Sequence, residues 1–309
     1  MEEHKLQPLL LTGAHRSGTT WIGRMLALDP STAYISEPLN VLHRPGVFRV
    51  PIHHWYQYIC EENEGEYLPA FHEVLEFKYH FWDEIRSIRS LRDFLRMGRD
   101  FKIFYSGLEE GRRALLKDPF AVFSTEWFAQ KLNVKIVISV RNPLGFVSSL
   151  KRLNWTFDFQ DLLDQPLLMR DHLEAYRSQM ESAQMKNVIE QGALLWKMIY
   201  KTVHSTLSRN PDFIIVRHED FSRDPITEFR KLYQTLGLDY THHIDKTILD
   251  SSSSENPMEL SGKKVHDVRL DSRANMSNWK KRLTEDEINR VRAVTEDVAQ
   301  LFYTDAEWA

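Results

Sequence analysis

The stretch LLLTGAHRSGTTW at residues 9–21 joins a short apolar run, a glycine-containing turn and the start of a helical pattern. Strand, turn and helix in this order aim backbone N–H groups and a helix dipole at an anion. Gly13 and Gly18 have the spacing of the nucleoside-triphosphate loop G-x-x-x-x-G-K-[ST], but Thr19 occupies the lysine position. Arg16 supplies a positive charge inside the loop instead. The loop is therefore predicted to bind a single phosphate rather than a triphosphate, with an ordinary turn before a helix as the alternative.

Three later apolar runs, at residues 114–116, 134–140 and 213–216, are each followed by a turn and a helical pattern. This alternation predicts an α/β fold in which a P-loop-like central parallel sheet is flanked by helices. After two of these runs, Asp118-Pro119 and Asn142-Pro143 each place an N-cap residue and a first-turn proline at the start of a helix.

The composition is that of a folded globular protein, with 309 residues, 42% of them apolar and 27% charged. We expect one domain over residues 1–309. The net charge of −4 predicts no nucleic-acid partner, so an anionic ligand needs a local cluster of positive groups. No stretch approaches the roughly 20 apolar residues of a membrane span or resembles a signal peptide, so a cytoplasmic location is expected. The one cysteine, Cys60, excludes an intrachain disulfide, and the oligomeric state stays open.

Two less regular zones, at about residues 40–110 and 152–192, interrupt the alternation. We predict that they are helical insertions that form the acceptor pocket. The first is rich in aromatic residues, namely Trp55, Tyr56, Tyr58, Tyr67, Tyr79 and Trp82. A third segment, residues 251–277, is predicted to be a mobile loop because it begins with four serines and carries four basic residues: Lys263, Lys264, Arg269 and Arg273.

A second anion site is predicted after the third apolar run. Arg141 follows that run directly, at the strand end where ligands of open α/β sheets bind. Ser149 lies about two helical turns later, so the arginine and the hydroxyl can reach one further phosphate. The alternative is an arginine that neutralises a surface carboxylate.

Together the two sites resemble the sulfotransferase family that depends on 3′-phosphoadenosine 5′-phosphosulfate (PAPS). Six consecutive residues resemble its 5′-phosphosulfate loop: Arg16, Ser17, Gly18, Thr19, Thr20 and Trp21. Arg141 and Ser149 match its 3′-phosphate pair. Three more segments agree in order within residues 9–302: 116–119 with its K-D-P strand end, 216–221 with its R-Y-E-D-L segment, and 273–280 with its late nucleotide-closing loop. The resemblance implies PAPS as co-substrate and an acceptor hydroxyl.

Some positions depart from the cytosolic branch of this family, which typically has a loop lysine and a catalytic histidine after the K-x-x-x-P strand. Here the loop has Arg16, and no such histidine follows Lys117. His218 replaces the usual tyrosine beside Glu219, which leaves the adenine contact at that position open. The chain is therefore closer to the carbohydrate and protein-tyrosine branches.

Sulfuryl transfer needs donor and acceptor held in line and positive charge near the departing oxygen. The resemblance implies Glu37 as general base, and Lys117 and Arg16 as the charges that stabilise the departing oxygen. The transferred group carries less charge than a phosphoryl group, so no metal is expected. His15 stays open as an acid/base or as a structural residue.

On the nucleotide side, the late loop implies that Arg273 adds charge at the 3′-phosphate and Trp279 lines the nucleotide, whereas Trp196 is expected in the core. The acceptor is predicted to be a carbohydrate, a glycolipid or a small alcohol. Two other interpretations are a P-loop small-molecule kinase and a non-catalytic nucleotide-binding protein.

Overall fold

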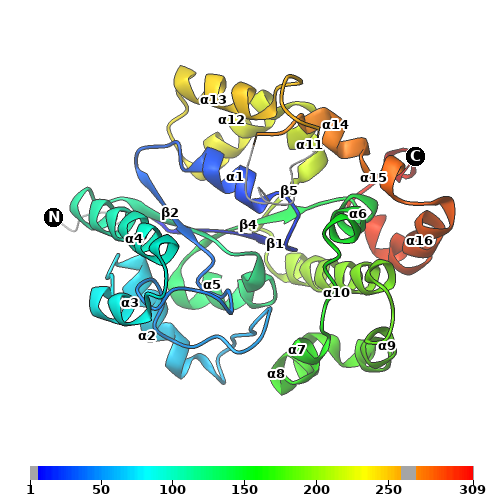
Figure 1. Cartoon of the computed structure of the whole chain (residues 1–309), viewed down its shortest axis with the longest axis horizontal. Helices are drawn as coiled ribbons and strands as arrows, with labels where there is room; N and C mark the ends of the chain where they lie inside the picture. The colour runs from blue at the N-terminus through cyan, green and yellow to red at the C-terminus, as the bar shows by residue number, and fades with distance from the viewer. Residues whose placement is uncertain (1–5, 259–268, 309) are drawn as a thin grey trace.

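The computed structural model describes residues 6–258 and 269–308 (Figure 1), so Lys263 and Lys264 of the predicted basic loop lie outside the described residues. The strands are β1 (Leu9–Gly13), β2 (Thr32–Ser36), β3 (Arg113–Lys117), β4 (Lys135–Val140) and β5 (Ile214–Arg217). The α-helices are α1 (Thr19–Leu26), α2 (Glu64–Leu75), α3 (Phe81–Ser87), α4 (Leu91–Glu109), α5 (Thr125–Leu132), α6 (Pro143–Leu153), α7 (Gln160–Leu163), α8 (Pro166–Leu168), α9 (Arg177–Ala183), α10 (Val188–Arg209), α11 (His218–Arg223), α12 (Pro225–Leu236), α13 (His242–Ser252), α14 (Ser272–Ser277), α15 (Trp279–Arg282) and α16 (Glu285–Ala299). Shorter turns are η1 (Pro119–Ser124), η2 (Met169–Leu173), η3 (Glu174–Tyr176) and η4 (Asp305–Trp308).

The strands of the described chain form one parallel sheet in the order β2-β3-β1-β4-β5, which confirms the predicted fold class. The four predicted apolar runs become β1, β3, β4 and β5, and β2 adds an edge strand beside β3. Asp118 and Asn142 cap the following helices as expected, accepting hydrogen bonds from the N–H groups of Phe120 and Leu144.

Helices cover both faces of the sheet (Figure 1). Successive side chains of a strand point to opposite faces, so Leu9 and Leu11 enter one core while Leu10 enters the other. The first core lies under α1, α12 and α13, and the second under α5, α6, α10 and α16. In the described part of the chain, no helix combines the length and apolar character that a bilayer crossing needs.

The prediction of a loop over residues 251–277 is partly wrong, because both ends of this range are helical. Residues 251–252 end α13, and residues 272–277 form α14, which begins with Asp271 accepting a hydrogen bond from the N–H of Ala274. A side-chain oxygen at the N-cap satisfies one of the open N–H groups of the first turn, so this short helix is locally specified.

Gly13 ends the central strand in a conformation that only glycine adopts easily. Its φ is +134°, and a Cβ there would lie 2.2 Å from the carbonyl oxygen of Ser139. Because that neighbour is backbone of β4, it cannot move without disturbing the sheet. We expect Gly13→Ala to lower the free energy of unfolding by about 3 kcal/mol or more in urea denaturation.

Gly65 supplies the matched control for this prediction. It lies in α2, and nothing lies within 4 Å of the position that a Cβ would occupy, so Gly65→Ala is expected to stabilise the protein by about 0.5 kcal/mol. A Gly13→Ala unfolding curve that superimposes on that of the wild-type protein would contradict the close approach of β1 and β4.

Candidate active site at the carboxyl ends of the strands

Four strands of the described sheet end in a residue predicted to be functional or lead to one, and the fifth leads to His218, for which the sequence leaves the adenine contact open. Glu37 follows β2, Lys117 ends β3, the glycine loop follows β1, Arg141 follows β4 and His218 follows β5. Because parallel strands end at the same edge of a sheet, residues from five separate parts of the chain meet there. The site is therefore a direct product of the strand order.

The glycine loop is held by hydrogen bonds from both sides. The N–H of Ala14 donates to the hydroxyl of Tyr200 at 3.2 Å, and the hydroxyl of Ser139 donates to the carbonyl of Ser17 at 2.6 Å. Arg16 has φ +66° and Gly18 has φ +91°, so the turn is left-handed at both positions. Thr19 and Thr20 form the first turn of α1, where backbone N–H groups are open to an anion.

Positive side chains converge on this loop. Arg16 Nε donates to Ser149 Oγ at 3.2 Å, and Arg141 Nη1 donates to the carbonyl of Arg16 at 2.9 Å. The pKa of Arg16 is lowered to about 10 by burial and by the nearby charges of Arg141, Arg152 and Arg282. Burial likewise lowers the pKa of Arg141. Like charges held together in a poorly solvated place favour a bound anion.

Arg152 and Arg282 were missed by sequence reasoning. Arg152 lies in α6, one turn beyond Ser149, and Arg282 ends α15. Arg282 Nη1 also approaches Ser148 Oγ at 3.5 Å. The position of Arg152 could have been found from its helical spacing to Ser149, whereas that of Arg282 depends on how α15 packs against α6.

Glu37 and Lys117, predicted as base and cation, form an ion pair. Lys117 is 2% exposed, and the N–H of Glu37 donates to its carbonyl at 2.8 Å. Asn40 Nδ2 donates to the other carboxylate oxygen of Glu37 at 2.7 Å. Asp118 fixes this segment by accepting from the N–H of Leu39 at 2.6 Å, and burial raises the pKa of Asp118 to about 7.

The two insertions hold the glycine loop between them. Tyr56, from the first insertion, has its hydroxyl 2.6 Å from His15 Nδ1. Trp155, at the start of the second, lies under the guanidinium of Arg16, with 5.7 Å from Cζ to the ring centroid. Burial and the charge of Arg16 lower the pKa of His15 to about 4. His15 is therefore neutral near pH 7, which suits a hydrogen-bonding role better than proton uptake.

His218 is buried beside the loop, and neither ring nitrogen has a hydrogen-bond partner among the described residues. Its Nδ1 would lie 2.5 Å from a Cβ at position 18, so Gly18 makes room for the ring. Burial and the charges of Arg141 and Arg16 hold its pKa well below the usual range. A buried polar group without a partner is rare, and a bound molecule is one way to satisfy it.

Three residues predicted to contact the nucleotide, Trp21, Trp279 and Arg273, instead contact other groups of the protein in this structure. Trp21 is 9% exposed, packs edge-on against His218 and Phe229, and donates from Nε1 to Ser251 Oγ at 3.0 Å. Trp279 is 8% exposed with the ammonium of its neighbour Lys280 over the ring.

Arg273 donates to the carbonyl of Arg223 at 3.2 and 3.1 Å, from Nε and Nη2. Its guanidinium is thus bound to α11 in this structure, and its predicted phosphate contact stays a prediction. Trp196 is fully buried as expected and donates from Nε1 to the carbonyl of Arg141 at 2.8 Å, which fixes the end of β4.

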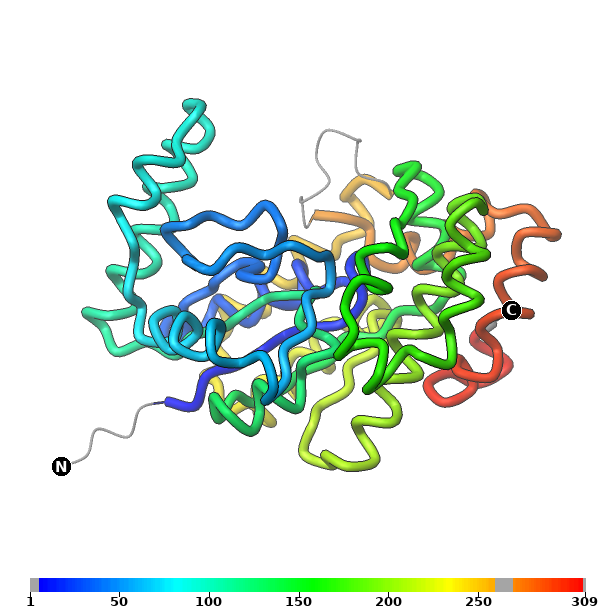
Figure 2. The backbone as a smooth tube through the Cα atoms, turned by 90° about the horizontal axis from the view of Figure 1, so that it is seen from below, coloured from blue at the N-terminus to red at the C-terminus, as the bar shows by residue number. Residues whose placement is uncertain are grey.

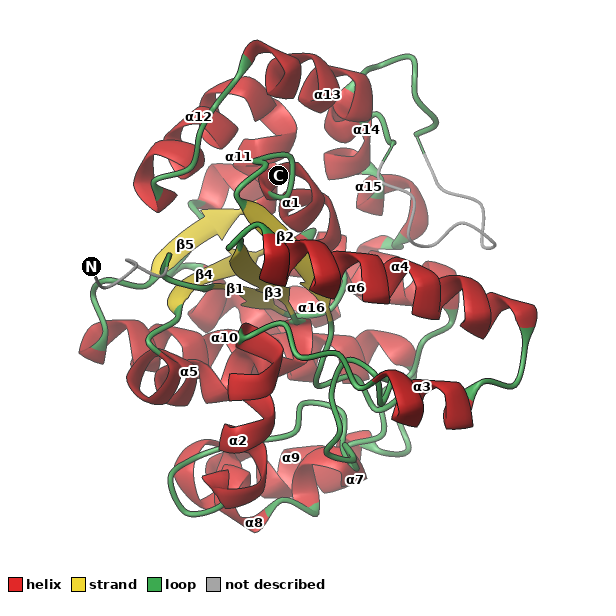
Figure 3. Ribbon diagram, turned by 90° about the vertical axis from the view of Figure 1, so that its left-hand side faces the viewer, coloured by secondary structure: helices red, strands yellow, loops and turns green. Residues whose placement is uncertain are grey.

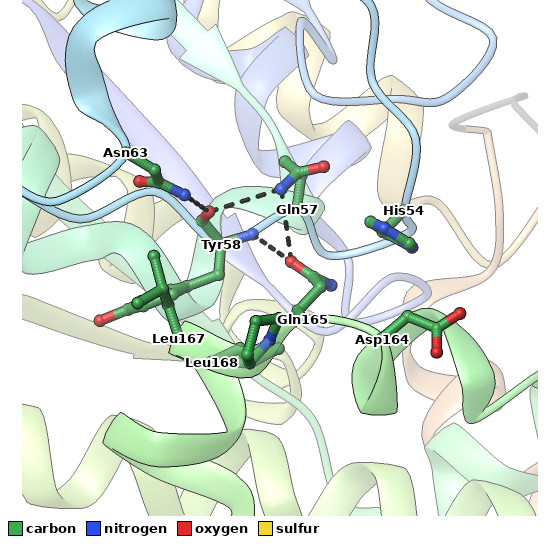
Figure 4. Close-up of a pocket in the computed structure, with 9 residues that line it drawn as sticks. His54, Gln57, Tyr58, Asn63, Asp164, Gln165, Leu167 and Leu168 are labelled. Carbon is green, nitrogen blue, oxygen red and sulfur yellow. Dashed lines mark hydrogen bonds between the residues drawn. The ribbon is translucent and has the colours of Figure 1, made fainter.

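A cavity of about 150 Å³ lies where the two insertions meet (Figure 4). Its lining includes Gln57, Tyr58 and Asn63 from the first insertion and Gln165 from the second. These polar groups are used by the protein itself: Gln165 Oε1 accepts from the N–H of Tyr58 at 2.8 Å, and Asn63 Nδ2 donates to the carbonyl of Tyr58 at 2.9 Å. The cavity is also smaller than most ligand pockets, so we regard it as a structural junction.

A parallel sheet with a glycine loop and converging arginines at its carboxyl edge defines a P-loop-like α/β protein. Residues 6–303 match the family described as the sulfotransferase domain. The chain therefore belongs to the sulfotransferase domain family.

Individual relatives are distant. Carbohydrate sulfotransferase 1 of Danio rerio is 24% identical over 192 residues, which cover 60% of this chain. That alignment covers only 39% of the relative's own length. Among solved structures, a sulfotransferase domain from the curacin biosynthetic pathway is 16% identical with a TM-score of 0.48, covering 97% of this chain and 98% of that one. Sulfotransferase STF9 from Mycobacterium avium is 14% identical with a TM-score of 0.48, covering 98% and 79%.

Proposed function

We propose that the protein transfers a sulfuryl group from PAPS to an acceptor hydroxyl, with Glu37 as the general base. The observation that carries the proposal is the meeting of Arg16, Arg141 and Ser149 at one end of the sheet. A ribose-bisphosphate nucleotide has two separate anionic ends, and the glycine loop and the Arg141–Ser149 pair offer one place for each. Neither site has the lysine with which a triphosphate loop meets the outer phosphates.

The bound donor supplies an activated sulfuryl group. Glu37 accepts the proton of the acceptor hydroxyl as that oxygen forms its bond to sulfur. The bond between sulfur and the bridging oxygen breaks, and its electron pair stays on the 5′-phosphate of the nucleotide, which leaves as adenosine 3′,5′-bisphosphate. We assign Lys117 and Arg16 to stabilising that charge. The ion pair between Glu37 and Lys117 keeps the base next to the cation.

The remaining nucleotide contacts are assigned by position. Ser17, Gly18, Thr19 and Thr20 present the loop and the first turn of α1 to the 5′ end, with Trp21 supporting them from the core. The ring nitrogens of His218 have no hydrogen-bond partner within residues 6–258 and 269–308, which makes this side chain a candidate for contacting the nucleotide in place of the family's tyrosine.

The acceptor is proposed to be a carbohydrate, a glycolipid or a small alcohol. The name of the Danio rerio relative supports the first of these. Three other expectations stay predictions: one domain over residues 1–309, a cytoplasmic location, and catalysis without a metal.

Thermal unfolding with three ligands tests the donor assignment. Adenosine 3′,5′-bisphosphate at about 100 times its Kd is expected to raise Tm by about 4 °C, because it binds only the folded protein. ATP, with or without Mg²⁺, is expected to give a much smaller shift at the same concentration. A larger shift with ATP and Mg²⁺ than with the bisphosphate would instead favour the kinase interpretation.

A further inference from the structure

Helices α3 and α4 form a hairpin that projects from the body of the protein (Figures 2 and 3). Helix α3 of this hairpin is anchored to the segment at residues 44–46 by a buried glutamate. Glu84 is fully buried, pairs with Arg44 at 2.6 Å and accepts from the N–H of Gly46 at 2.8 Å. On its inner face, α4 buries Met97 and Phe104. These buried contacts hold the hairpin against the rest of the protein, so the same outer surface is presented whenever the chain is folded.

Helix α4 exposes large apolar side chains from its first turn to its last. Leu91 is 85% exposed and Leu95 73% exposed. The exposed apolar side chains recur at helical spacing and so form one stripe: Leu91, Phe94, Leu95, Phe101, Tyr105 and Leu108.

Aromatic rings continue the stripe onto α3. Phe81 lies between Trp82 and Phe101, with ring centroids 5.5 and 5.8 Å apart, and Trp82 is 71% exposed. An apolar surface of this extent on a hairpin that projects from the body indicates an interaction site.

The basic side chains of the hairpin are concentrated in one part of it: residues 81–109 hold six basic and five acidic residues, and all six basic residues lie between positions 86 and 102. Residues 86–102 contain six basic and two acidic residues, although the whole chain has a net charge of −4. Both acidic residues are paired, Asp93 with Arg44 at 3.2 Å and Asp100 with Arg99 at 2.7 Å. Arg92, Arg96 and Arg99 recur at helical spacing, so they form a row beside the apolar stripe.

We propose that this hairpin docks the protein onto an anionic lipid surface. Leucine and aromatic side chains enter the boundary between headgroups and acyl chains, while the arginines remain at the level of the anionic headgroups. A second copy of the chain fits less well, because a two-fold interface centred on this stripe places the two basic rows in the same contact. The inference does not rest on the proposed function.

Vesicle co-sedimentation of the full chain tests the proposal. The protein is expected to pellet with vesicles of phosphatidylcholine and phosphatidylserine, much less with phosphatidylcholine alone, and less as salt is added. Leu91→Gln with Leu95→Gln, and separately Arg92→Glu with Arg96→Glu, are each expected to lower the partition coefficient at least about tenfold. Both pairs change exposed side chains only, so folding should be preserved.

Matched controls change the same chemistry elsewhere on the surface. Met185→Gln with Leu249→Gln removes exposed apolar side chains, and Lys201→Glu with Lys246→Glu reverses exposed charges. Both should leave vesicle binding unchanged. The proposal is overturned if the wild-type protein does not pellet, if the hairpin variants pellet equally well, or if the leucine pair instead abolishes a dimer. The assay contains no nucleotide, so its result is independent of the sulfuryl-transfer assignment.

Discussion

Glu37→Gln is expected to lower kcat for sulfuryl transfer by about 10² to 10⁴-fold, the usual contribution of a positioned general base. Glutamine keeps the size of the side chain and can still accept the hydrogen bond from Asn40. It cannot take up a proton from the acceptor hydroxyl. The rate is measured under saturating PAPS with an acceptor that the wild-type protein sulfates.

The pH profile separates a base from a merely structural carboxylate. The wild-type kcat/KM should fall on the acidic side as the base becomes protonated, and this limb should disappear in Glu37→Gln. Because Lys117 is buried and loses its partner, the variant also loses stability, so its folded fraction and bisphosphate binding are measured in parallel.

Glu174→Gln serves as the matched control. It removes a carboxylate from an ion pair with Arg177 on the surface, and it should leave kcat unchanged. If Glu37→Gln turns over at the wild-type rate and still binds the bisphosphate, Glu37 is not the base, although the family membership stands.

The main features of the sheet could be predicted because local sequence specifies them. Asp118-Pro119 and Asn142-Pro143 mark helix starts by chemistry that acts within a few residues, and the apolar runs before them are buried strands. Since strand order places all carboxyl ends at one edge, predicting the strands also placed Arg16, Lys117 and Arg141 near one another. Only the edge strand β2 had no strong signal of its own.

Contacts between distant segments could not be predicted in this way. The hydroxyl of Tyr56 meets His15 across a separation of 41 residues, and that of Tyr200 meets Ala14 across 186. Neither tyrosine differs in its sequence context from an ordinary core aromatic residue. Arg282 likewise comes close to Arg16 only because α15 packs against α6. Such contacts depend on tertiary packing, which a single sequence does not display.

Arg16→Gln is expected to weaken binding of adenosine 3′,5′-bisphosphate by about 10²-fold, equivalent to about 2.7 kcal/mol, measured by calorimetric titration. The guanidinium donates a hydrogen bond to Ser149 and lies close enough to Arg141 for their charges to interact, so its removal takes positive charge from the proposed nucleotide site. Arg209→Gln removes a surface arginine that pairs with Glu126 and should leave the affinity unchanged.

The free energy of unfolding of ligand-free Arg16→Gln should rise or stay the same, although its affinity for the bisphosphate falls. The pKa of Arg16 is lowered to about 10, which means that folding disfavours its charged form at neutral pH. Replacing the arginine with a neutral side chain removes the cost of burying a charge and the repulsion from Arg141, Arg152 and Arg282, so the ligand-free variant should unfold at the same or a higher urea concentration in low salt. Removing a residue that stabilises the fold lowers the free energy of unfolding of the protein. Removing a residue that serves only to bind a ligand lowers the affinity for that ligand instead. Equal bisphosphate affinity in Arg16→Gln and the wild-type protein would show that these arginines do not form the nucleotide site.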